Sequence, residues 1–174
     1  NAFYIGLYPN VGFYIRYGGA NQPGNTYVIS SSTLGFTANS WHHLAATWNH
    51  VLGTTTLKIY VDGALVNNTT CNLILNLSAP SFFGGDPISP KFGPGSMDEI
   101  RVWNYARSAV QMASSYNTPI ANAQTGLLAY HNFNVGVPGG SNLAFAHLPD
   151  VVSPINVDTL ENFTLNGASS NFIN

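Results

Sequence analysis

The feature that most constrains the fold is an alternating apolar pattern that ends at Asp62-Gly63. In residues 57–62 every second residue is a branched apolar one, so Leu57, Ile59 and Val61 share one face. This is the pattern of a half-buried β-strand. Asp and Gly both tolerate positive φ, so Asp62-Gly63 predicts a tight hairpin turn, with residues 64–66 as the returning strand. Residues 41–49 alternate with apolar groups in both sets, which predicts a strand covered on both faces. The sequence therefore predicts antiparallel sheet.

Composition extends this prediction to the whole chain. At 174 residues the chain can bury a sizeable core as one domain. Charged residues make up only 7 % of it, well below the usual quarter, while hydrophobic residues make up 45 %. With 17 Gly and 10 Pro, this mix favours many short strands joined by turns and excludes a disordered chain.

The charge balance limits the partners. The net charge is −2, and the five Lys and Arg form no basic stripe, so we expect neither nucleic acid nor an anionic membrane surface as a partner. No run of about 18 apolar residues occurs, which argues against membrane insertion. The low charge leaves little repulsion between copies, so self-association is an expected property.

The remaining elements are assigned from short alternating runs and turn signals. Ser108 is a suitable N-cap for the one predicted helix, residues 108–116. Residues 3–8 and 12–17 are predicted to form a hairpin, and Asn166-Gly167 a turn between residues 163–165 and 170–173. The other predicted strands are 27–31, 73–77, 81–83, 97–103 and 127–133, with loops at 84–95 and 136–141 and a linker at 119–125.

The single cysteine excludes an intrachain disulfide. Cys71 has no base near it in sequence, so we interpret it as a partly buried strand residue rather than a nucleophile. The five histidines form no zinc pattern and are interpreted as packing or surface residues. Because the chain begins with Asn1, we expect a mature or trimmed product, or part of a larger protein.

Four motifs occur in an order that resembles a known family. WHHLAATWN, LKIYVDGALV, FFGGD and GSMDEIRVWNYARS follow one another as in bacterial laminin-G-like and pentraxin-like domains of the concanavalin A type, over residues 27–116. The resemblance implies an all-β fold: a two-sheet antiparallel jelly-roll sandwich with one short helix. The tail, TGLLAYHNFNVG onward, resembles a segment of large secreted adhesins of Bacteroidetes-type bacteria. We therefore expect a secreted, extracellular or cell-surface location.

The chain departs from the family at its start. The usual opening strands, with FDG-like and EAW motifs, are missing before Asn1. We predict a jelly roll over residues 1–118 and a tail over 119–174 that supplies further strands to the same or a neighbouring sandwich. LLAYHNF resembles the opening strand of related domains, so it is a candidate for the place beside residues 97–103; strand addition from a neighbouring chain is the alternative.

The positions of the acidic residues bear on whether the protein cleaves glycans or only binds them. Some relatives of this fold cleave glucans with two carboxylates on one face, but Asp98 and Glu99 are consecutive in a predicted strand and would point to opposite faces. We therefore predict no enzyme activity. The resemblance implies a structural calcium at Asp98, with Asp86 as a weaker oxygen ligand. The alternative is that Asp98 bonds backbone amides of a neighbouring loop, while Glu99 and Arg101 pair on one face.

The binding and modification candidates complete the prediction. Glycan-binding platforms are expected among aromatic residues, each of which is otherwise a core residue: Trp48, Tyr60, Trp103, Tyr105 and Tyr130. Glycosylation candidates are the sequon residues Asn67, Asn68, Asn76 and Asn162, and Thr159 in an Asp-Thr-Leu sequence that resembles a Bacteroidetes signal. The predicted function is a non-catalytic extracellular adhesion or surface-assembly module, with glycans, surface proteins or copies of itself as partners. The alternatives are a carbohydrate-binding module of a secreted enzyme and a filament subunit closed by strand addition.

Overall fold

The computed structural model divides into two compact units, each described by itself. Unit 1 comprises residues 1–95 and 105–118, and unit 2 comprises residues 96–104 and 119–174. The chain therefore leaves unit 1 after Gly95, contributes one strand to unit 2 and returns at Tyr105. The described residues are 3–8, 12–17, 26–28, 39–72, 83, 85–86, 91–92, 95–121, 124–145, 147–153, 155, 157–160 and 164–166.

Unit 1 begins with a three-stranded antiparallel sheet. It contains β1 (Phe3–Tyr8), β2 (Gly12–Tyr17) and β3 (Thr26–Val28), in that order. The predicted hairpin is confirmed with the same bounds, and Tyr8 lies opposite Gly12 at its turn. β3 begins one residue before the predicted strand 27–31, of which residues 29–31 lie outside the described residues.

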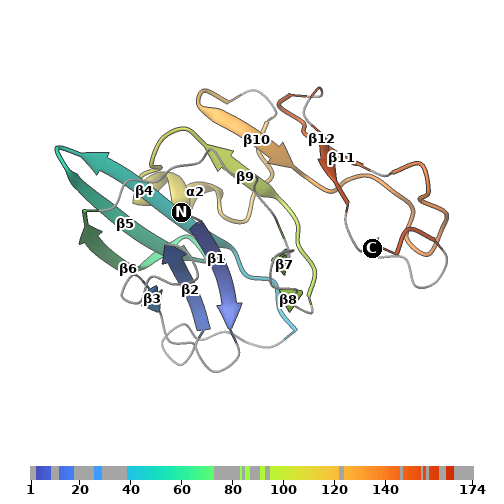
Figure 1. Cartoon of the computed structure of the whole chain (residues 1–174). Helices are drawn as coiled ribbons and strands as arrows, with labels where there is room; N and C mark the ends of the chain where they lie inside the picture. The colour runs from blue at the N-terminus through green and yellow to red at the C-terminus, as the bar shows by residue number, and fades with distance from the viewer. Residues whose placement is uncertain are drawn as a thin grey trace. The chain divides into compact units, whose positions relative to one another are not determined.

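The central sheet of unit 1 carries the first two family-like motifs. Its strands are β4 (Leu44–Val51), β5 (Thr54–Val61) and β6 (Ala64–Cys71), in the order β4-β5-β6 (Figure 1). β5 lies between the other two, and its alternating side chains Thr55, Leu57, Ile59 and Val61 are all buried, which confirms the predicted apolar face. Tyr60, on the opposite face, is buried as well.

Both turns of the central sheet use positive φ at their two central residues. Asp62 and Gly63 have φ of 49° and 77°, which confirms the predicted hairpin turn. Gly63 is also required by packing, because a Cβ there would lie 2.7 Å from Cδ1 of Tyr116. Leu52 and Gly53 form the same kind of turn, with φ of 50° and 80°. The sequence did not predict this second turn, because a branched apolar residue rarely adopts this conformation.

The segment after β6 differs from its prediction. Residues 84–95 were predicted to be a loop, but β7 (Gly85–Asp86) and β8 (Lys91–Phe92) pair within it. Of the predicted strands 73–77 and 81–83, residues 73–82 lie outside the described residues, and Phe83 is in a bend.

The helix α2 (Ala109–Ser115) confirms the predicted helix and its cap. The hydroxyl of Ser108 accepts a hydrogen bond from the Gln111 amide, and the Gln111 side chain accepts one from the Ser108 amide. This reciprocal capping box stabilises a helix that is otherwise barely two turns long. Met112 is buried, and α2 lies against β6.

In unit 2, the strand supplied from the middle of the chain pairs with the tail. β9 (Ile100–Trp103) and β10 (Leu127–His131) are antiparallel, with a bulge between Leu127 and Ala129. β9 starts later than the predicted residue 97, because Glu99 has a φ of 57° and leaves the extended conformation. β10 likewise stops before residue 133.

The rest of unit 2 contains a hairpin that the sequence did not predict. β11 (His147–Pro149) pairs with β12 (Val157–Thr159). Before it, the fully buried Asn142 holds the preceding loop, because its amide group bonds both the N–H and the carbonyl of Val137, at 2.6 and 2.9 Å. The predicted turn at Asn166-Gly167 lies mostly outside the described residues.

The described elements are mostly antiparallel strands, which agrees with the all-β prediction. α2 is the helix found among the described residues. The arrangement of the strands into two facing sheets remains a prediction. None of the helical segments in the described part of the chain has the length and apolarity needed to cross a membrane.

Candidate functional site

A polar cluster fixes the hairpin turn between β5 and β6 to the start of β4. The carboxylate of Asp62 contacts Nδ1 of His42 at 2.9 Å through Oδ2, and its Oδ1 accepts the His43 N–H at 2.9 Å. The Asp62 N–H in turn donates to the His43 carbonyl at 2.9 Å. On the far side of the ring, Nε2 of His42 lies 3.0 Å from the Ser40 hydroxyl.

The contacts keep this carboxylate ionised. Burial favours its protonated form, but the hydrogen bonds from the His42 ring and the His43 amide outweigh burial and lower the pKa of Asp62. The order Ser40–His42–Asp62 is also that of a Ser–His–Asp charge relay. However, Ser40 is exposed and only two residues from His42, and Asp62 is itself a turn residue. We therefore interpret the cluster as a lock on the turn.

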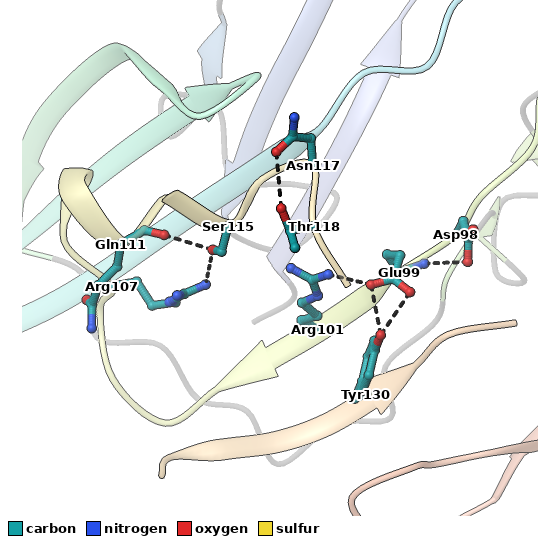
Figure 2. A network of polar contacts seen from close by, with 9 residues as sticks. All are labelled: Asp98, Glu99, Arg101, Arg107, Gln111, Ser115, Asn117, Thr118 and Tyr130. Atoms are coloured by element: carbon teal, nitrogen blue, oxygen red, sulfur yellow. Dashed lines mark hydrogen bonds and ion pairs between the residues drawn. The ribbon is translucent and has the colours of Figure 1, made fainter. Parts of the chain in front are cut away.

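A second cluster joins β9 to β10 in unit 2 (Figure 2). Glu99 forms an ion pair with Arg101, and both of its carboxylate oxygens accept hydrogen bonds from the Tyr130 hydroxyl, at 2.8 and 2.9 Å. The Arg101 guanidinium also lies over the Tyr130 ring, 5.6 Å from its centre. These contacts confirm the predicted Glu99–Arg101 pair and show that it includes the tail.

Burial and the neighbouring carboxylate both favour the neutral phenol. Burial first, and then the hydrogen bond to Glu99, raise the pKa of Tyr130, so its hydroxyl remains a donor at neutral pH. Glu99 thereby accepts from two donors on adjacent strands. Its carboxylate is committed to holding β9 and β10 in register.

A third cluster attaches the segment after β11 to β10. Asp150 is 2 % exposed, and its Oδ1 accepts the N–H groups of Tyr130 at 3.0 Å and Val152 at 2.9 Å. The Val151 N–H donates to the Tyr130 carbonyl at 2.9 Å. A buried carboxylate with backbone donors thus replaces part of a strand ladder beside β10.

The same segment is held by His131. Its Nδ1 lies 3.2 Å from the Pro149 carbonyl, and its Nε2 lies 2.9 Å from Oδ2 of Asp158. Both neighbours are oxygen acceptors, one on β11 and one on β12, so the ring connects β10 to both strands of this hairpin.

Of the two predicted calcium ligands, the structure describes the side chain of Asp98 alone. Asp98 is exposed, and its Oδ1 accepts the N–H of Glu99, the next residue, at 2.8 Å, rather than an amide of a neighbouring loop as the alternative predicts. Because Glu99 leaves the strand, the prediction that Asp98 and Glu99 occupy opposite faces of one strand is wrong. Asp86 lies in β7, with its side chain outside the described part. Within that part, no three His, Cys, Asp or Glu side chains form a metal-binding group.

The predicted glycan platforms differ in exposure. Tyr60 is 0 % exposed, which agrees with the core role expected of these aromatic residues as the alternative to a platform, and the strand β5 is covered on this face too. Tyr130 is 2 % exposed, and its hydroxyl donates to Glu99. Trp48 and Trp103 are half-buried, and Tyr105 is 41 % exposed.

Trp41 was not among the aromatic residues predicted to bind glycans. It is 66 % exposed, more than Phe83 or Tyr105, the other aromatic residues given as exposed among the described side chains. Trp is usually well buried, so such exposure marks a candidate contact residue. The predicted strand 41–49 includes Trp41, whereas β4 begins only at Leu44, so the alternating pattern gave no signal that this residue lies outside the core.

The glycosylation candidates that the structure describes are accessible. Asn67 and Asn68 are exposed on β6, and Thr159 is exposed on β12. Asn76 and Asn162 lie outside the described residues. Cys71 is half-buried at the end of β6, as predicted.

Comparison with known proteins gives one match. A family model of the laminin G type, described as the concanavalin A-like lectin/glucanases superfamily, matches residues 1–113. No curated protein and no solved structure matches the chain. The matched region contains β9 but not β10, so the pairing of these strands joins the matched region to the tail.

Proposed function

The chain belongs to the concanavalin A-like lectin/glucanase superfamily, and from this premise we propose that it is a non-catalytic extracellular module for adhesion or surface assembly. Its rigid sheets would present turns and strand edges to glycans, surface proteins or copies of itself. The superfamily includes both binding and cleaving proteins by its description, so the choice between them depends on the carboxylates.

One observation carries the non-catalytic proposal. Each acidic side chain that the structure describes accepts a hydrogen bond or an ion pair from the chain itself: Asp62, Asp98, Glu99, Asp150 and Asp158. A glycosidase needs two carboxylates on either side of the scissile bond, one of them free to donate a proton. Carboxylates that hold turns and strands in place support binding rather than cleavage.

The test compares binding with cleavage on one set of soluble glycans. We expect retention of the protein by a glycan array or by cell surfaces, without release of reducing sugar. Cleavage that disappears in Glu99→Gln would overturn the proposal. Labelling of the wild type, but not of Ser40→Ala, by an active-site serine probe would overturn it in another way, since Ser40, His42 and Asp62 have charge-relay order.

Carbohydrate binding is the second candidate, because Trp41 is exposed. A flat indole face suits stacking on the apolar face of a pyranose, and Trp41 lies in the region matched by the family model. Trp41→Ala should remove glycan retention, whereas Leu52→Ala, at a 98 % exposed turn position, should leave it unchanged. Equal retention by both variants would reject Trp41 as the platform.

A further inference from the structure

β6 is an edge strand of the central sheet with an open side. It pairs with β5 along one edge, and no strand among the described residues lies along its other edge. Residues 64–68 and 70 are exposed, whereas β4, at the opposite edge of the sheet, is half-buried or buried from Leu44 to Trp48. The sequence predicted that the strand at residues 97–103 would need a neighbouring strand from the tail or from another chain. In the structure, β10 of the tail pairs with one side of that strand.

β6 lacks two of the protections that edge strands usually carry. Its sequence, ALVNNTTC, contains neither a charged residue nor proline. Natural edge strands commonly use such residues to prevent pairing with another chain. The register shift between Ile59 and Tyr60 interrupts the strand near Val66, but Asn67–Cys71 then pairs regularly with Thr55–Ile59. No described strand pairs with the outer edge of this regular segment, which leaves it available to a partner strand.

We propose that Asn67–Cys71 pairs antiparallel with the same segment of a second copy of this chain, across a two-fold axis at Thr69. Asn67 would then lie opposite Cys71 of the second copy, and Asn68 opposite Thr70. The two central sheets become one continuous sheet. This inference rests on the assembly part of the proposed function and names the partner as the chain itself.

The charges and side chains of the strand favour this partner. The net charge is only −2 for each copy, so long-range repulsion is weak. The facing residues are Asn and Thr, whose side chains form hydrogen bonds across antiparallel pairs. A contact of this length buries little surface, so we expect a weak dimer that depends on concentration. A glycan on Asn67 or Asn68 would block the edge, so the dimer belongs to the unglycosylated chain.

Sedimentation velocity of the full chain over a range of concentrations tests the proposal. The wild type should shift from monomer to dimer. Thr70→Lys should weaken the dimer at least about tenfold, because each added charge lies opposite Asn68 of the second copy, whose β5 neighbour is Lys58. Leu52→Lys adds the same charge at an exposed turn and should dimerise as the wild type does.

A second measurement does not depend on any variant's folding. In the wild type, hydrogen exchange should slow as the protein concentration rises at those amides of Asn67–Cys71 that point away from β5, whereas the amides that bond β5 should change little. A wild type that stays monomeric at every concentration, or a Thr70→Lys variant that dimerises like the wild type, would overturn the inference. A monomer that still binds glycans or cell surfaces would leave the proposed function standing, whereas loss of all such binding would remove that function.

Discussion

Asp62 in unit 1 and Asp150 in unit 2 make the same kind of contact in different surroundings. Each carboxylate accepts the backbone N–H of a residue far back in the chain. Asp62 accepts from His43, 19 positions earlier, at 2.9 Å, and Asp150 accepts from Tyr130, 20 positions earlier, at 3.0 Å. The Asp62 side chain is 42 % exposed, whereas Asp150 is 2 % exposed. If the Asp62 side chain is removed, water can accept the N–H of His43 in its place. At the buried site of Asp150, water cannot easily reach the N–H of Tyr130. Burial, rather than bond geometry, should therefore decide which contact matters more for stability.

The largest effect should follow from Asp150→Ala. This change leaves the N–H groups of Tyr130 and Val152 without their acceptor, and we expect the free energy of unfolding to fall by about 3 kcal/mol. Urea denaturation measures the loss. Hydrogen exchange should quicken at these two amides in particular, and Asp150→Asn, which keeps an acceptor oxygen, should lose less. Unchanged exchange at Tyr130 would show that the carboxylate does not hold this segment.

A smaller loss should follow from Asp62→Ala in the exposed turn. Alanine lacks the acceptor for His42 and His43, and it tolerates the φ of 49° less well than Asp does. We expect a loss of about 2 kcal/mol, measured by thermal and urea unfolding. Asp62→Asn is the matched control, because it keeps an acceptor and tolerates positive φ, and it should lose less than half as much. Equal losses would assign the effect to charge instead of conformation.

The same comparison shows what the sequence could predict. The Asp62-Gly63 turn is a local signal, so the turn and both of its strands followed from the residues themselves. Leu52-Gly53 has the same geometry, but leucine gives no such signal, and its turn was missed. In unit 2, Asp150 accepts the N–H of Tyr130, a residue of β10 that lies 20 positions earlier in the chain. No pattern near Asp150 encodes that partner, so neither its burial nor the β11–β12 hairpin could be predicted.

Among the site residues, too, contacts between residues close in sequence were predictable and contacts between distant residues were not. The Glu99–Arg101 pair was predictable, since the two residues are close in sequence. The involvement of Tyr130, 31 residues further on, was not. For Tyr60 the sequence left a core role and a glycan platform both open, because alternation along β5 assigns that residue to the face opposite Leu57 and Ile59 and contains no information about what covers this face.

Tyr130→Phe sharpens the comparison within unit 2. The change removes the hydroxyl that bonds Glu99 but keeps the ring, the Arg101 contact and the amide that bonds Asp150. We expect a loss of about 1 to 2 kcal/mol in the free energy of unfolding, because a hydrogen bond to a charged group is lost. Combining this change with Glu99→Gln in a double-mutant cycle should show coupling. Additive losses would show that the hydroxyl and the carboxylate act independently.

The smallest effect should appear in acid. The pKa of Asp62 is lowered in the folded chain, so its contribution to stability is present above the unfolded-state pKa, near 3.8, and is lost as the pH falls through the lower folded-state value. The side chain is well exposed, so the loss should stay below about 1 kcal/mol. Unfolding of wild type and Asp62→Asn, measured from pH 5 to pH 2, isolates this contribution, since the variant lacks the titrating group. Their difference in stability should shrink below about pH 4. A difference that stays constant to pH 2 would mean that the His42 and His43 contacts do not favour the ionised carboxylate, and that the exposed lock depends on turn conformation alone.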